Sequence, residues 1–459
     1  MSRQQDFTEG NIVKQMLAFS APIIFTNLLQ VSYQFTDSLW VGNLLGGNAL
    51  GAVAVSSTVI FTILSFIIGI NNATLTILSQ QKGKDNEEGL KRYLNAFVVV
   101  LTAMAIFLGI VGFLFAETIL GLLGTPEAMM GEAVTYLRIN ALGILFLLGY
   151  NFIGTVLRAV GDSRTPLRFV TIAVVLNIFL DPLLISGFGL GVDGAAYATI
   201  LSQGSAFLYG IYYVRKHQLV PFTVPKLPKR EEVLLILNLG VPSGLQMSVI
   251  SAGVAAIMSV VTSHGEAVVA GFSAAQRLDS VIMLPAQALG TAVNSMAGQN
   301  IGVRKWDRVS KITTYGLLYN LGIMLLLALL LVIMAEVAIK LFIQEPGPVQ
   351  FGSHYLRIVA FFYPFLGINF ILNGTVRAAG AMYQVLILNI ISFWVLRYPL
   401  TYLCSELLGE TGIAFGMGIS FVISSLFAFL YYRYGKWREK KLFQNKDDSQ
   451  KTRGNRDEN

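Results

Sequence analysis

The chain of 459 residues contains little charge, one cysteine and three histidines, and each scarcity excludes a class of protein. Lys, Arg, Asp and Glu make up 13% of the residues, whereas soluble domains carry about 25%. The single cysteine, Cys404, excludes an internal disulfide and a cysteine-based metal cluster. Because the apolar runs hold no nucleophile–base pair or set of metal ligands, the sequence disfavours an enzyme, and we expect no cofactor.

Apolar residues dominate instead, at 54% of the chain, and the mean hydropathy is +0.63. Runs of about 20 apolar residues, the length that crosses the hydrocarbon core of a bilayer, recur along the chain. They lack the short alternating strands of a membrane barrel. The sequence therefore predicts an all-α polytopic membrane protein with twelve transmembrane helices, near 16–42, 48–78, 93–116, 129–157, 167–187, 192–214, 234–262, 266–298, 313–343, 349–376, 383–405 and 411–434.

Basic residues are concentrated in alternate connections between these runs. Of the 33 Lys and Arg residues, 28 lie in the termini or near 80–92, 158–168, 215–230, 302–311 and 377. Because basic loops stay in the cytoplasm, we expect a multi-pass protein of the cell (inner) membrane with both termini cytoplasmic. The net charge of +7 then reflects topology, so the lipid bilayer is the expected partner and nucleic acid is not.

An internal repeat divides the chain into two halves. The string YLRI occurs at 136–139 and again 219 residues later, at 355–358. We call this separation the repeat offset, and it also relates LRAVG (157–161) to VRAAG (376–380). Several matches at one offset indicate a duplication. Since each half holds an even number of spans, we expect two six-helix lobes related by a pseudo-twofold axis along the membrane normal. The expected order is a cytoplasmic N-terminus (1–14), an N-lobe (15–216), a linker (217–232), a C-lobe (233–434) and a disordered charged tail (435–459).

Polar residues interrupt the apolar runs of the N-lobe at similar depth. Counting from the outer ends of their spans, Asp37, Asp181 and Thr199 lie about 8 to 10 Å inside the membrane. Asn177 precedes Asp181 by one helical turn and shares its face. Asn151 lies deeper on the fourth span. Because charges within a membrane are costly, we interpret these residues as one functional polar cluster.

A structural role for the carboxylates is the main alternative. Asp181 beside Pro182 could satisfy a kinked helix, and Asp37 could face outer water. The C-lobe serves as an internal control, because it aligns Ile257 with Asp37 and Tyr398 with Asp181. If the carboxylates only held the fold, the duplicate lobe would need them too. The asymmetry therefore favours chemistry in the N-lobe.

This cluster suits the loading of a small cation. A carboxylate removed from water favours its neutral form, so it can take up and release a proton. The oxygens of Asp37, Asn177, Asp181 and Thr199 are also hard ligands, which suit Na⁺. The sequence leaves H⁺ and Na⁺ open as the coupling ion.

Further polar residues are candidates for a substrate cavity. Tyr33 and Gln34 precede Asp37 on the first span and are expected to line an adaptable aromatic cavity. Arg277 and Asp279 lie within the eighth span and do not face each other at this spacing. We assign them to the cavity, either in a structural ion pair or in a second coupling site.

Four motifs make the chain resemble the multidrug and toxic compound extrusion (MATE) family over nearly all of residues 10–435. They are DSLWVGNLLG (37–46), LRAVGDSRTP (157–166), LNIFLDPLLI (176–185) and GVDGAAYAT (191–199). The resemblance implies two six-helix lobes, export of organic cations against H⁺ or Na⁺, and a cation set at Asp37, Asn177, Asp181 and Thr199, with Tyr33 and Asn151 beside it. One branch of the family carries an acidic residue in the seventh span. Here that span reads GVPSGLQMSVISAGVAAIMSV without an acid, which points to the DinF-like branch.

The sequence therefore predicts a cation-coupled antiporter that exports amphipathic, mostly cationic drugs by alternating access, acting as a monomer. The alternative is a flippase of lipid-linked sugars or lipids, which would need a strongly basic cavity. The spans contain few basic residues, namely Arg138, Arg277, Lys340, Arg357 and Arg397. A channel is a third option, but the repeat and the asymmetry between the lobes fit alternating access better.

Overall fold

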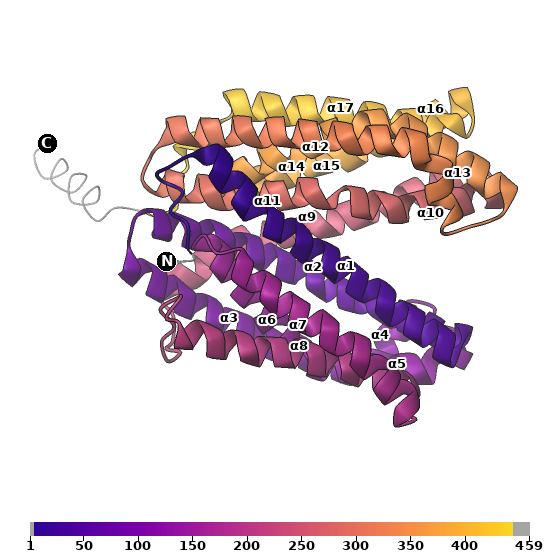
Figure 1. Ribbon diagram of the computed structural model, residues 1–459, viewed down its shortest axis with the longest axis horizontal. Helices are drawn as coiled ribbons and strands as arrows, with labels where there is room; N and C mark the ends of the chain where they lie inside the picture. The colour runs from indigo at the N-terminus through magenta and orange to yellow at the C-terminus, as the bar shows by residue number, and fades with distance from the viewer. Residues whose placement is uncertain (1–3, 444–459) are drawn as a thin grey trace, which may run out of the picture.

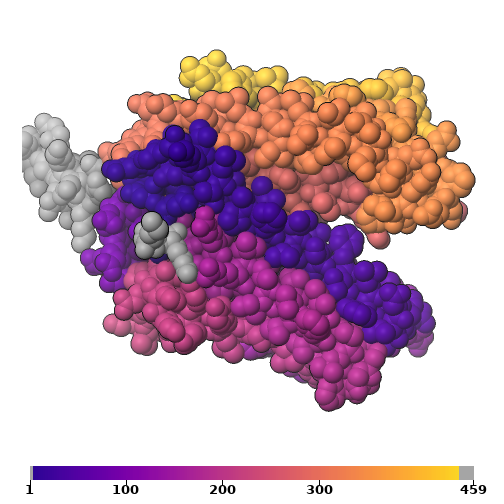
Figure 2. Space-filling view, in the orientation of Figure 1, coloured from indigo at the N-terminus to yellow at the C-terminus, as the bar shows by residue number. Residues whose placement is uncertain are grey.

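Two helical bundles meet at one end of the molecule and separate toward the other (Figure 1). The computed structural model describes residues 4–443, and these fold into helices and connections without a strand. We call one end the basic end, because it holds the connections after Gly83, Ala159, Lys216 and Gly302. The opposite end, where the lobes are visibly apart in Figure 2, is called the open end.

The N-lobe contains eight α-helices within the described residues. They are α1 (Ile12–Leu45), α2 (Gly47–Gly83), α3 (Glu87–Leu114), α4 (Ala116–Leu122), α5 (Glu127–Leu142), α6 (Ile144–Ala159), α7 (Arg164–Pro182) and α8 (Gly191–Lys216), with a π-helical turn η1 (Leu183–Gly187) after α7.

The C-lobe follows the same order with more interruptions. Its helices are α9 (Arg230–Thr262), α10 (Glu266–Ile282), α11 (Leu284–Gly302), α12 (Trp306–Lys340), α13 (Pro346–Val359), α14 (Tyr363–Ala378), α15 (Met382–Ile390), α16 (Tyr398–Leu408) and α17 (Thr411–Tyr434). Short turns η2 (Ala360–Phe362) and η3 (Ile391–Arg397) link some of them, and η4 (Lys436–Glu439) follows α17.

The prediction of twelve spans agrees with these helices. Ten helices of the described chain are long and apolar enough to cross a membrane, and the pair α5 and α6, bent by 50°, adds an eleventh. The less apolar α8, at 26 residues, is long enough to be the twelfth. The chain is therefore an all-α, multi-pass membrane protein.

The helix bounds follow the repeat offset found in the sequence. Helices of the two lobes begin one repeat offset apart in four pairs, namely α2 and α10, α3 and α12, α5 and α13, and α6 and α14. For example, α2 begins at Gly47 and α10 at Glu266, and α6 begins at Ile144 and α14 at Tyr363. The first helix of each lobe also packs across the boundary, α1 against α11 and α9 against α2. These contacts between helices of different lobes join the lobes near the basic end and leave the open ends free to separate.

The terminal segments differ from the expectation of simple polar tails. Trp437 is fully buried, and its ring packs against Trp306 and Tyr432. Phe443 contacts Tyr93 of the N-lobe. The expectation of a disordered tail from residue 435 is therefore wrong for residues 435–443, because a few aromatic side chains within the charged stretch bury apolar surface. Residues 444–459 lie outside the described part of the chain.

Candidate functional site

The N-lobe encloses a cavity of about 720 Å³ within its helical bundle. This volume lies within the range of about 300 to 1,000 Å³ that is typical of small-molecule sites. The walls come from α1, α2, α5, α6, α7 and α8. Most of the lining is apolar, and its polar members are Gln30, Tyr33, Gln34, Asp37, Ser38, Ser57, Thr58, Tyr136, Asn140, Tyr150, Asn151, Thr199 and Gln203.

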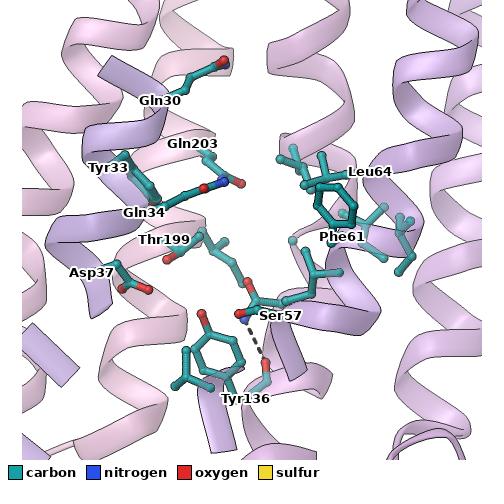
Figure 3. Close-up of a pocket in the computed structure, with 18 of the residues that line it drawn as sticks. Gln30, Tyr33, Gln34, Asp37, Ser57, Phe61, Leu64, Tyr136, Thr199 and Gln203 are labelled. Atoms are coloured by element: carbon teal, nitrogen blue, oxygen red, sulfur yellow. Dashed lines mark hydrogen bonds between the residues drawn. The ribbon is translucent and has the colours of Figure 1, made fainter. Parts of the chain in front are cut away.

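Five residues that the sequence singled out line this one cavity. Tyr33, Gln34 and Asp37 share a face of α1, because residues three and four apart are neighbours on a helix. Thr199 enters from α8 and Asn151 from α6. Figure 3 shows the Asp37 carboxylate and the Thr199 hydroxyl on the same side of the space. The structure thus brings together residues from the first and the last helix of the N-lobe.

Asn177 and Asp181 lie behind the cavity wall. Both are fully buried and neither is among the lining residues. Asn177 Nδ2 donates a hydrogen bond of 3.0 Å to Asp181 Oδ1, which confirms that the two share a helix face. Within residues 4–443, Asp181 Oδ2 and Asn177 Oδ1 have no hydrogen-bond partner. α7 ends at Pro182 and continues as the π-helical turn η1, since proline lacks a backbone donor.

The two carboxylates have no counter-charge. Asp37 lies close enough to Asp181 for the two to repel each other. In the described chain the ion pairs are Lys91–Glu87, Arg92–Glu232 and Lys340–Glu336, so neither aspartate has a Lys or Arg within 4.0 Å. Asp37 is 9% exposed, and its Oδ1 also lacks a partner. Unpaired buried charges are strongly unfavourable, so this arrangement calls for a proton or a cation.

The donor set fits a small cation better than a transition metal. Residues 4–443 contain no group of three or more His, Cys, Asp or Glu residues that could hold a metal ion. Two carboxylates, with the free carbonyl oxygen of Asn177 and the Thr199 hydroxyl nearby, offer only hard oxygen ligands. Such ligands suit Na⁺-like ions, and the carboxylates alone suit protons.

Two tyrosines of the site were missed by the sequence analysis. Tyr136, in α5, lines the cavity and is close enough to both carboxylates to interact electrostatically with them. Tyr150 lines the cavity from α6 and interacts with Gln30 of α1. The signal for Tyr136 was present, because it is the first residue of the repeated YLRI string, but that string was used only to detect the duplication.

Arg277 and Asp279, the remaining candidates for the substrate cavity, lie in the other lobe. Both lie on α10 of the C-lobe and neither lines the N-lobe cavity. The Arg277 guanidinium lies 5.9 Å from the ring centroid of Phe342, and Asp279 accepts a hydrogen bond from the Tyr363 hydroxyl. The structural ion pair is also absent, since no ion pair of residues 4–443 includes either side chain.

Comparison with known proteins agrees with this architecture. The family model described as MatE matches the chain twice, at residues 22–183 and 242–403, once in each lobe. The chain is 62% identical to the "Probable multidrug resistance protein YpnP" of Bacillus subtilis (strain 168), over 96% of this chain and 99% of that protein. It is 30% identical to the "Probable multidrug resistance protein YoeA" of the same organism, over 95% and 97%.

A solved structure shares the fold. It is described as the outward-facing conformation of a multidrug resistance MATE family transporter of the MOP superfamily. The TM-score is 0.88 at 24% identity, over 93% of this chain and 96% of that one. Because the family model covers both lobes and the relatives align over nearly their whole length, the chain belongs to the MatE family.

Proposed function

We propose that this protein is a multidrug exporter that couples the entry of H⁺ or Na⁺ to the export of amphipathic, mostly cationic small molecules. The observation that carries the proposal is the charge of the N-lobe cavity. Its lining contains Asp37 and no Lys, Arg or His, and Asp181 lies unpaired behind it. Several relatives are named as multidrug resistance or export proteins, which supports the same substrate class.

The lining favours cationic amphipathic molecules for physical reasons. Apolar side chains such as Phe61, Leu64 and Ile144 provide most of the wall, which suits the burial of a hydrophobic scaffold. Asp37 supplies a negative charge, and Tyr33 and Tyr136 supply ring faces, which attract cations. The flippase alternative would need cationic side chains for a phosphate, and this cavity has none in its lining.

Export follows if the ion and the drug compete for the same carboxylates. Asp37 lies on α1 and Asp181 on α7, two helices that pack against each other. A proton or Na⁺ removes their mutual repulsion and lets the helices approach, which would narrow the cavity. A ligand shifts such an equilibrium only by its differential affinity for the two states. The drug then favours the ion-free, wide cavity, and the ion favours the narrow one.

The basic end is the cytoplasmic end in this proposal, because it gathers the Lys- and Arg-rich connections. Both termini are then cytoplasmic, and the protein acts as a monomer in the cell membrane. The lobes are separated at the open end, so the described conformation would expose the N-lobe cavity to the outside (Figure 2). Release of drug to the outside, and loading of the ion from there, both require this state.

Proteoliposomes with an imposed ion gradient test the proposal. We expect an inwardly directed gradient of the coupling ion, H⁺ or Na⁺, to drive a cationic dye outward against its own gradient. Dye movement should stop when an ionophore dissipates that ion gradient. Asp37→Asn should abolish the response to the gradient. Dye movement that is equal with and without both gradients would overturn coupled export. Movement of lipid-linked sugar but not of dye would favour the flippase.

A further inference from the structure

The lobes are joined at the basic end by hydrogen bonds that occur in pairs. Gln80 of α2 donates from Nε2 to the carbonyl of Ala378, at 2.7 Å. Gln299 of α11 donates from Nε2 to the carbonyl of Ala159, at 3.1 Å. Donors and acceptors are both related by the repeat offset, so each lobe gives the other the same bond.

A second pair repeats the arrangement one helical turn away. Thr76 Oγ1 donates to the carbonyl of Arg377, at 3.1 Å, and Ser295 Oγ donates to the carbonyl of Arg158, at 2.7 Å. These residues are also related by the repeat offset. The contact between the lobes is therefore self-complementary, like the interface of a twofold symmetric dimer within one chain.

The acceptors explain why these bonds can form and break. α6 ends at Ala159 and α14 ends at Ala378, so the four carbonyls belong to the last turns of these helices. Carbonyls in the last turn of a helix have no partner within the helix. The glutamines of the opposite lobe supply that partner for Ala159 and Ala378. The carbonyls of Arg158 and Arg377 also accept from the backbone N–H groups of Gly161 and Gly380, so the opposite lobe gives them a second donor. Water could replace the side-chain donors without unwinding either helix.

Glycines let α2 and α11, the helices that carry the donors, touch each other. A Cβ atom at Gly83 would lie 1.9 Å from the carbonyl oxygen of Gln299, and one at Gly302 would lie 2.3 Å from that of Gln80. Both distances are far below van der Waals contact, so neither position accepts a side chain in this state. The repeated QQKG (80–83) and QNIG (299–302) strings are thus explained by the lobe contact.

We propose that Gln80, Gln299, Thr76 and Ser295 form a clasp that holds the basic end closed while the N-lobe cavity is open at the other end, and that parts as one unit when the protein turns inward. The inference rests on the proposed transport function, which requires two such states. All four side chains are less than 5% exposed, so their partners are lost together when water enters.

The N-terminal segment, residues 4–10, adds an unequal element to this symmetric clasp. The backbone N–H of Phe7 donates to Gln299 Oε1 at 3.0 Å, and Arg308 Nε donates to the Phe7 carbonyl at 2.8 Å. Phe7 is fully buried. Gln299 therefore holds both the N-lobe and the N-terminal segment, and its loss should open the clasp more readily than the loss of Gln80.

Distance measurements between the lobes test the clasp. In a Cys404→Ser background, spin labels at Leu44→Cys of α1 and Leu341→Cys after α12 mark the open ends of the two lobes, where both side chains are exposed. We expect the otherwise unmodified protein to give mainly long distances. Gln80→Ala combined with Gln299→Ala should add a population of short distances, because opening the basic end brings the open ends together.

Gln81→Ala is the matched control, since Gln81 is an adjacent buried amide of α2 that lies beside Gly89 of its own lobe. A disulfide between Ser79→Cys and Gly298→Cys is the second variant. A Cβ atom at Gly298 would lie 3.0 Å from that of Ser79, so a small shift reaches the usual disulfide separation of about 3.8 Å. In the glutamine double variant, this disulfide is formed before labelling, and the labels are attached through thioether bonds that a reductant does not cleave. The oxidised protein should then lack the short population, and reduction should restore it.

Equal distance distributions in the glutamine double variant and the Gln81→Ala control would overturn the clasp, as would a short population that persists in the oxidised protein. These measurements need no drug. Failure of the unmodified protein to export dye would therefore count against the proposed function alone, while the label distances would still decide whether the clasp holds the basic end.

Discussion

The two lobes share their helices but not their interior. At the repeat offset, Gly143 and Ile144 of the N-lobe correspond to Phe362 and Tyr363 of the C-lobe. The ring of Phe362 lies so close to Gly418 that a Cβ there would be 2.2 Å from it. Phe362 and Gly418 thus touch in the C-lobe, whereas their counterparts at the repeat offset, Gly143 and Thr199, line the N-lobe cavity. The duplicated scaffold thus leaves space in the N-lobe at positions where the C-lobe holds an aromatic ring.

The charges of the two lobes differ in the same direction. In the C-lobe, Asp279 accepts a hydrogen bond from the Tyr363 hydroxyl. The buried Arg397 guanidinium lies 3.8 Å from the ring centroid of Phe393 and 4.6 Å from that of Phe421. Asp279 thus shares its charge with a tyrosine hydroxyl, whereas Asp37 and Asp181 of the N-lobe are two acids that lie close enough to repel each other. Carboxylates without a counter-charge, as in the N-lobe, are better suited to a site that must gain and lose a charge.

The largest difference between the lobes is expected when the N-lobe carboxylates are changed. Asp37→Asn and Asp181→Asn should each lower ion-driven dye export by an order of magnitude or more, roughly 1.4 kcal/mol per tenfold. The aligned C-lobe change, Tyr398→Phe, should leave export near the level of the unmodified protein. Export rates in proteoliposomes, normalised to the amount of protein in the membrane, provide the measurement. Equal losses from changes in both lobes would refute an N-lobe coupling site.

The packed interior of the C-lobe gives the next effect. Phe362→Ala removes the ring that fills the space beside Gly418, so we expect a loss of stability of about 2 to 3 kcal/mol, because such cavities are costly. Dye affinity should stay unchanged, since the N-lobe cavity is untouched. Thermal unfolding in detergent and a fluorescence titration separate the two effects. A large fall in affinity without a change in unfolding would place the ligand in the C-lobe.

Paired tyrosines sharpen the comparison further. Tyr136 of the N-lobe corresponds to Tyr355 of the C-lobe, and both are buried. Tyr136→Phe should lower export several-fold, because its hydroxyl lies near both carboxylates. Tyr355→Phe removes a hydroxyl that contacts Met417 Sδ at 3.2 Å and lies near Asp279 and Arg397 of the C-lobe, away from the N-lobe carboxylates, and export should change little. Initial export rates of the two variants decide the matter, and an equal effect would argue against a special role for Tyr136.

The smallest expected effect concerns the ion pairs at the two ends. Arg92 and Glu232 pair across the lobes at the basic end, where Glu232 is 3% exposed. Arg92→Ala leaves that buried carboxylate without its cation and should cost about 1 to 3 kcal/mol. Lys340→Ala at the open end breaks an exposed pair with Glu336 and should leave the stability nearly unchanged. Unfolding temperatures of the two variants check this order.

Much of the fold could be predicted from the sequence, because apolar length and the repeat offset are properties of the chain itself. Depth along a helix was also predictable, and it grouped Asp37 with Thr199 correctly. Rotation about the helix axis was not predictable, so the burial of Asn177 and Asp181 behind the cavity wall became visible only in the structure.

The errors have a common physical cause, which is packing between segments distant in the chain. Arg277 and Asp279 are as polar as the N-lobe residues, but Tyr363 and Phe342, far along the chain, determine what they contact. The burial of Trp437 within the charged tail was not predictable for the same reason. It depends on packing against Trp306, which is distant in the chain. Composition predicts which residues are unusual, and only the packed structure shows which of them meet.

The dependence of substrate affinity on the coupling ion tests the central claim most directly, namely that drug and ion share the unpaired carboxylates of the N-lobe. In detergent, we expect the affinity for a cationic dye to fall when the pH is lowered or when Na⁺ is added. Asp37→Asn should flatten that dependence. A wild-type affinity that stays constant between about pH 5 and 8, the range in which a buried carboxylate would titrate, both with and without Na⁺, would contradict the account.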